Sequence, residues 1–124
     1  MTHVETLKST EMFSTLNRDQ LEQLGELSTN LQLERNDQIF TEDDAATALF
    51  ILLQGRIAIT RNSVDERESV LALMEPGDLF GEMPFFDNGD RSAAARALEP
   101  STVLAVPYTA LHILYSQHPE LLWP

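Results

Sequence analysis

Three side chains in one short stretch have the right chemistry to hold a small phosphorylated molecule. The stretch from Phe80 to Ala97 reads FGEMPFFDNGDRSAAARA and includes Glu82, Arg91 and Ser92. The planar guanidinium group of an arginine grips a phosphate through two hydrogen bonds, and a serine hydroxyl adds another donor. A carboxylate cannot bind phosphate, but it accepts hydrogen bonds from sugar hydroxyls. A phosphate and a ribose together indicate a nucleotide.

The residues that follow the carboxylate predict a short helical turn. Gly81 lets the backbone approach a ligand closely and Pro84 suits a first helical turn, so we expect one turn of helix over residues 82–86. Unpaired N–H groups at such a start attract an anion. We expect Arg91 to lie at the opening of a strand.

A simpler interpretation gives each of these side chains an ordinary structural role. Arg91 is next to Asp90 and near Asp87, so it could be half of an exposed ion pair worth about 0–1 kcal/mol. Glu82 could be a carboxylate favoured by the helix dipole. For any one residue the two interpretations have even odds, and only the full spacing favours a nucleotide site.

The stretch resembles the phosphate-binding cassette of the cyclic nucleotide-binding domain. Phe80-Gly81-Glu82 followed by Arg91-Ser92-Ala93 is similar to the cassette of Crp/Fnr-type regulators, the bacterial cyclic-AMP receptor proteins, and of the protein kinase A regulatory subunit. The resemblance extends over roughly residues 8–120. Further matching segments are Ile39-Phe40, Glu42, Asp44, Leu49-Phe50-Ile51-Leu52, Gln54-Gly55-Arg56-Ile57 and Glu75-Pro76-Gly77-Asp78.

This resemblance implies a role for each matching residue. Glu82 would bind the ribose 2′-hydroxyl, and Arg91 and Ser92 would bind the cyclic phosphate. The backbone N–H groups of Gly81 to Met83, directly after Phe80, would support them. Ile59 and Leu71 fall where the family lines its base pocket and would pack against the purine, although an apolar residue on a strand is a core residue by default.

Several residues depart from the family pattern. Pro84 lacks an N–H where the family often donates one to the phosphate, and Asp90 replaces an uncharged residue and could compete for the guanidinium. Three turn positions that are usually glycine in the family are Asn36, Asp43 and Glu66 here. Positive φ suits Asn best and Glu worst, so the turn at residue 66 is expected to differ. Weak binding or a different ligand therefore stays open.

Composition predicts a single domain. With 124 residues and 43% hydrophobic content, the chain can bury one core but is too short for two domains of ordinary size. Cysteine is absent, the amino terminus does not resemble a signal peptide, and the longest apolar run, Ala48 to Leu53, is too short to span a bilayer. We therefore expect a soluble cytoplasmic protein without membrane contact.

The charge balance argues against nucleic-acid binding by this chain alone. Eight Lys and Arg against twenty Asp and Glu give a net charge of −12. Duplex binding depends mainly on cations that meet phosphates, so we expect no DNA binding without a further domain.

The pattern of elements predicts a mainly β fold with flanking helices. We expect N-terminal helices over residues 1–30, a jelly-roll-like β-roll (a double-stranded β-helix) over 31–106, and a C-terminal helix over 107–124. Asn17 with Gln20 is typical of a capping box. The last helix is expected to start at Pro107 and to end at His118-Pro119.

In the family, a long dimer helix begins about where Pro119 stands and leads to an effector domain, which is a helix-turn-helix in bacterial regulators. Because the chain ends at Pro124, we expect the sensor part of a longer, homodimeric regulator, with the DNA-binding domain absent. The leading hypothesis is a sensor for a cyclic mononucleotide, with 3′,5′-cyclic AMP favoured, whose binding shifts the helices. The alternatives are a ligand-free β-roll interaction module, and a regulatory domain of another effector. Cyclic GMP competes as the ligand, because Ser92 could also contact guanine.

Neither an enzyme nor a cofactor or metal is expected. Cupins share the β-roll shape and bind metal through histidines and a glutamate, whereas His3, His112 and His118 fall in helical or terminal segments without ligand spacing. Ser92 precedes an alanine run and lacks the G-x-S-x-G pattern of a nucleophile.

Overall fold

Two antiparallel sheets form the body of the protein. The computed structural model describes residues 3–65 and 67–121. Within them, each sheet has four strands, and the predicted mainly β architecture is confirmed. The first sheet, in spatial order, consists of β1 (Thr29–Leu33), β8 (Ser101–Pro107), β3 (Ala48–Gln54) and β6 (Leu79–Phe80). The second consists of β2 (Gln38–Phe40), β7 (Ala94–Ala97), β4 (Ile57–Asn62) and β5 (Glu68–Met74).

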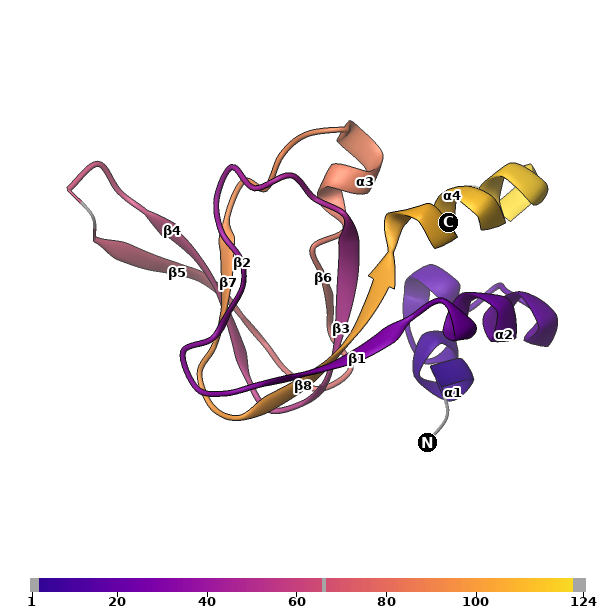
Figure 1. Ribbon diagram of the computed structural model, residues 1–124, viewed down its shortest axis with the longest axis horizontal. Helices are drawn as coiled ribbons and strands as arrows, with labels where there is room; N and C mark the ends of the chain where they lie inside the picture. Colours follow the sequence, from indigo (N-terminus) through magenta and orange to yellow (C-terminus); the bar gives the residue numbers. More distant parts are fainter. Residues whose placement is uncertain (1–2, 66, 122–124) are drawn as a thin grey trace.

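The longer helices gather at one end of the roll. Figure 1 shows α1, α2 and α4 at that end, the β4–β5 hairpin projecting at the opposite end, and α3 above the strands. The helical segments are α1 (His3–Lys8), the 3₁₀ turn η1 (Glu11–Phe13), α2 (Arg18–Glu26), α3 (Met83–Asp87), α4 (Tyr108–Gln117) and the 3₁₀ turn η2 (Pro119–Leu121). No helix among residues 3–65 and 67–121 is long and apolar enough to cross a membrane.

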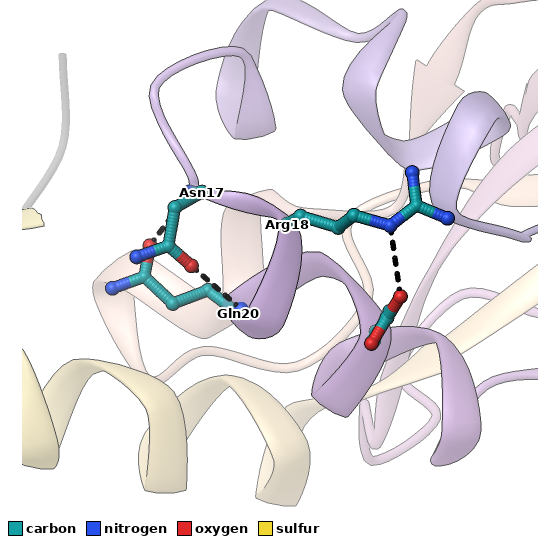
Figure 2. Close-up of polar contacts among 4 residues, drawn as sticks. Asn17, Arg18 and Gln20 are labelled. Atoms are coloured by element: carbon teal, nitrogen blue, oxygen red, sulfur yellow. Dashed lines mark hydrogen bonds and ion pairs between the residues drawn. The ribbon is translucent and has the colours of Figure 1, made fainter.

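A reciprocal capping box starts α2, as the sequence predicts. The N–H of Gln20 donates to Asn17 Oδ1 at 2.9 Å, and the N–H of Asn17 donates to Gln20 Oε1 at 2.9 Å (Figure 2). Each bond satisfies a backbone N–H that the helix itself leaves without a partner. The cap therefore fixes where α2 begins.

Strand β3 of the first sheet is buried on both faces, which explains its continuous apolar run. Leu49 and Ile51 pack against the helices, whereas Phe50 and Leu52 point into the roll. Successive side chains of a strand alternate between the faces of a sheet, so both faces of β3 must be apolar. Two cores result, one between the sheet and the helices and one inside the roll.

The turns largely follow the sequence expectations, with one correction at the strands. Asn36 and Asp43 both adopt positive φ, at 73° and 67°, whereas Glu66 lies outside the described residues.

Strand β7 begins only at Ala94, so the expectation that Arg91 opens a strand is wrong. Arg91 instead lies in the loop between α3 and β7. The direction of its side chain is therefore not set by the alternation of side chains along a strand.

Candidate functional site

A cavity of about 270 Å³ lies against β6, the start of α3 and the loop before β7. This volume is slightly below the range of roughly 300–1,000 Å³ that is usual for small-molecule pockets. The charged and hydroxyl-bearing side chains in its wall are Glu82, Arg91 and Ser92. The rest of the wall is apolar or glycine and is formed by Phe40, Ile59, Ala72, Met74, Leu79, Phe80, Gly81, Met83, Pro84 and Ala93.

The structure brings all but one of the predicted site residues to this cavity. Those that line it are Phe80, Gly81, Glu82, Met83, Arg91, Ser92 and Ile59. Leu71 is not among the lining residues, and its side chain is 52% exposed. The next residue on β5, Ala72, lines the cavity instead and is paired with Ile59 across the hairpin. Successive side chains of a strand point to opposite faces, so Ala72 and not Leu71 lies on the cavity side of β5 in this structure.

Arg91 is the most deeply buried charged residue of the site, with 4% of its surface exposed. Its Nη1 donates to the carbonyl of Gly81 at 2.7 Å, and its Nη2 donates to the carbonyl of Ala48 at 2.6 Å. Burial lowers the pKa of the guanidinium, which nevertheless stays protonated because arginine does not lose its proton in proteins. The Nε atom is buried and has no hydrogen-bond partner among residues 3–65 and 67–121. Arg91 thus lines the cavity with a positive charge and has one buried donor that no described residue satisfies.

Aromatic rings hold the Arg91 guanidinium from one side. Its Cζ lies 4.0 Å from the centre of the Phe40 ring, a cation–π geometry. Phe40 in turn packs against Phe50 with ring centres 5.9 Å apart, and Phe50 against Phe80 at 5.5 Å. These contacts, together with the carbonyl bonds, restrict the guanidinium to one place in the cavity wall.

Gly81 is required by its backbone conformation and by its close neighbours. Its φ is +80°, and a Cβ at this position would lie 3.0 Å from Arg91 Nη1 and 3.3 Å from the Phe50 ring. Side chains rarely adopt this φ, and the added atom would push the guanidinium away. The glycine therefore allows the cassette backbone to approach Arg91.

Glu82 is a half-buried carboxyl beside the arginine. Burial raises its pKa above the ordinary value of 4.5, and the opposing effects of its own backbone N–H and of the Arg91 charge are smaller. Glu82 precedes α3 as its N-cap residue, with Pro84 in the first turn of that helix. Its carboxyl group is therefore an acceptor at the edge of an otherwise apolar wall.

The expected competition between Asp90 and Arg91 is not observed. Asp90 is exposed, and among the described residues no ion pair joins the two side chains. Nor do the described residues contain a group of three or more His, Cys, Asp or Glu side chains that could hold a metal ion.

Two contacts of the site could not be predicted from the sequence. Tyr108, the first residue of α4, donates its hydroxyl proton to the Gly81 carbonyl at 2.5 Å. Arg61 of β4 donates to the carbonyl of Ser92 through Nε at 3.2 Å and Nη2 at 3.1 Å. Both residues are distant in sequence from the groups they bind, so local spacing could not reveal them. Phe40, by contrast, stands within one of the family-like segments.

A family model matches most of the chain. The model is described as "Cyclic nucleotide-binding domain", and it matches residues 30–118. This range contains every residue that lines the cavity.

Several known proteins with similar sequences or structures are transcription regulators. The chain is 31% identical over 87 residues to a CRP-like cAMP-activated global transcriptional regulator of Mycobacterium tuberculosis, covering 70% of this chain and 39% of that protein. It is 41% identical over 68 residues to the cyclic AMP receptor protein of Thermus thermophilus, covering 55% and 32%. The N-terminal domain of a transcriptional regulator from Streptomyces coelicolor superposes with a TM-score of 0.81 at 31% identity, covering 94% of this chain and 81% of that one. The chain thus spans well under half the length of the two curated relatives.

Proposed function

The chain belongs to the family of cyclic nucleotide-binding domains, and from this premise we propose that its cavity binds a cyclic mononucleotide, with 3′,5′-cyclic AMP as the preferred ligand. The observation that carries the proposal is the position of Arg91, Ser92 and Glu82 in one otherwise apolar cavity wall. Arg91 and Ser92 bind the cyclic phosphate, with support from the N–H groups of Gly81 to Met83. Glu82 accepts a hydrogen bond from the ribose 2′-hydroxyl.

The unused donor of Arg91 supports this assignment of the phosphate. A buried N–H group without a partner costs free energy, so the free protein carries a cost that an anionic acceptor removes. The charge-assisted bond that forms is roughly twice as strong as a neutral one. Arg91 is held in place by carbonyl groups and by Phe40, so little side-chain entropy is lost when the ligand binds.

The apolar part of the wall supports adenine rather than guanine. Ile59, Ala72 and Met74 offer no hydrogen-bonding side-chain group, and guanine has two exocyclic polar groups, O6 and the N2 amine, whereas adenine has one, the N6 amine. Burying such a group without a partner is unfavourable. Ser92 is the one lining hydroxyl that could contact a guanine, and the proposal assigns it to the phosphate. The names of the two curated relatives, both of which refer to cyclic AMP, point in the same direction.

In a longer protein this domain would act as the sensor of a transcription regulator. Ligand binding would shift the flanking helices and so reorient a separate DNA-binding domain, and the complete protein would be a homodimer. A ligand acts in this way only through a difference in affinity for the two conformations.

Isothermal titration calorimetry with cyclic AMP and cyclic GMP tests the proposal. We expect the native chain to bind cyclic AMP more tightly than cyclic GMP, and Arg91→Ala to lose about 2–5 kcal/mol of binding free energy. Arg91→Lys keeps the charge but not the planar fork, so it should bind with intermediate affinity. Arg35→Ala is the matched control, because Arg35 is exposed and outside the cavity. A folded native chain that binds neither nucleotide would refute the proposal and favour a ligand-free module.

A further inference from the structure

Tyr108 connects the cassette to the first turn of α4. Its phenol oxygen donates to the carbonyl of Gly81 at 2.5 Å, and Arg91 Nη1 donates to the same carbonyl at 2.7 Å. Arg91 Nη1 also lies 3.5 Å from the phenol oxygen, a long and therefore weak hydrogen bond. One carbonyl group of the cassette is thus shared between the arginine and a residue of α4.

The same two residues are also anchored next to each other at the start of β3. The backbone N–H of Tyr108 donates to the carbonyl of Thr47 at 2.8 Å, and Arg91 Nη2 donates to the carbonyl of the next residue, Ala48, at 2.6 Å. Tyr108 is 8% exposed and Arg91 is 4% exposed. Neither side chain can therefore move far without breaking buried hydrogen bonds, which are costly to leave unmade.

The bond from Tyr108 also fixes the orientation of a peptide group in the cassette. The peptide between Gly81 and Glu82 is trans, so its carbonyl and its N–H point in opposite directions. Holding the Gly81 carbonyl toward Tyr108 consequently holds the Glu82 N–H away from it. The phenol thus sets the direction of a backbone donor that the proposed function assigns to the phosphate.

We propose that Tyr108 is a positioning residue that locks Arg91 and the Gly81–Glu82 peptide to α4, and that it thereby couples occupancy of the cavity to the first turn of that helix. The positioning part depends only on the contacts above, and the coupling part rests on the proposed function. Because binding linkage is reciprocal, removing the Tyr108 hydroxyl changes both the ligand affinity and the response of α4 to the bound ligand.

The positioning part is tested in the absence of any ligand with Tyr108→Phe, which removes only the hydroxyl. The readout is solvent exchange of the Arg91 Nε–H measured by ¹⁵N NMR, with the resonance assigned by its loss in Arg91→Lys. We expect exchange to accelerate several-fold in Tyr108→Phe. Tyr115→Phe is the matched control, because Tyr115 is half-buried on the same helix and packs on Phe85 with ring centres 6.1 Å apart. The control should leave the Arg91 exchange rate unchanged.

The coupling part is tested with cyclic AMP on the same variants. We expect Tyr108→Phe to bind about 2- to 12-fold more weakly, the equivalent of one net hydrogen bond of about 0.5–1.5 kcal/mol. Hydrogen–deuterium exchange of the α4 backbone at saturating cyclic AMP should change in the native chain and in Tyr115→Phe, and change less in Tyr108→Phe.

The outcomes separate the two parts from the proposed function. An unchanged Arg91 exchange rate in Tyr108→Phe overturns the positioning role, whether or not the chain binds a nucleotide. Accelerated exchange with native affinity and a native α4 response overturns the coupling. Failure of the native chain to bind cyclic AMP refutes the proposed function and the coupling with it, and the Arg91 exchange rate still decides the positioning role.

Discussion

Burial shifts the pKa values of the two charged residues of the cavity in opposite directions. It raises the pKa of Glu82 and lowers the pKa of Arg91, so it disfavours the charged form of both. The arginine keeps its proton regardless, whereas the carboxyl group can be neutralised within an accessible pH range. Glu82 is therefore the residue at which pH should act on this site.

Glu82→Gln should stabilise the free protein at neutral pH. The folded-state pKa of Glu82 lies above its ordinary value of 4.5, so its contribution to stability is present below 4.5 and lost as pH rises through the folded-state pKa. The variant carries no charge to bury, and thermal denaturation should give a higher Tm than the native chain at pH 7, with the difference shrinking toward pH 4. The same variant should bind cyclic AMP more weakly, because an amide is a weaker acceptor than a carboxylate. A Tm difference that does not change with pH would contradict this account.

The residues of the site differ in how far the sequence could predict them. Glu82, Arg91 and Ser92 share one short segment, so their types and spacing were enough to place them at one cavity. Tyr108 follows Arg91 by 17 residues and Arg61 precedes Ser92 by 31, with strands between them. Such contacts are made by the closing of the roll, which local spacing does not encode. Leu71 was expected at the cavity but does not line it, because one residue along β5 decides which face a side chain occupies.

At the scale of single elements, the local signals were reliable where the interaction itself is local. The capping box of α2 joins Asn17 and Gln20, three residues apart, and it could be recognised directly. The start of β7 could not, because strand ends depend on pairing with β2 and β4. The strand order of the two sheets likewise depends on contacts between distant segments.

The α2 cap offers a test of stability that is independent of the cavity. Asn17→Ala removes the side-chain acceptor of the box, which should lower the free energy of unfolding by about 1 kcal/mol. Arg18→Ala, the neighbouring control, breaks only the exposed pair with Glu22, at 3.0 Å (Figure 2), and should cost no more than about 0.5 kcal/mol. Urea denaturation measures both variants. Equal losses from the two substitutions would mean that the box contributes no more than the surface ion pair.

At the scale of the whole molecule, β3 and β8 separate a core on the helix side from a core inside the roll. Leu49, Ile51, Leu104 and Val106 on β3 and β8 pack toward the helices, and Phe50 and Val103 pack inside the roll. The alternation within these two strands couples the two cores, because each strand belongs to both. Under the proposed function, movement of the cassette next to Phe50 and Phe80 would therefore reach a sheet that also carries the helices.

The net charge of −12 sets a further expectation for the whole molecule. The protein should repel an anionic nucleotide at long range, while buried Arg91 attracts it at contact. Salt shortens the Debye length from about 30 Å at 0.01 M to about 8 Å at 0.15 M, which screens the distant acids far more than the buried arginine. Stopped-flow measurements should therefore show cyclic AMP associating faster as NaCl is raised over this range, with little change in the dissociation rate. Association that slows steeply with salt would instead mean that attraction to cations on the surface, rather than Arg91 in the cavity wall, guides the ligand to its site.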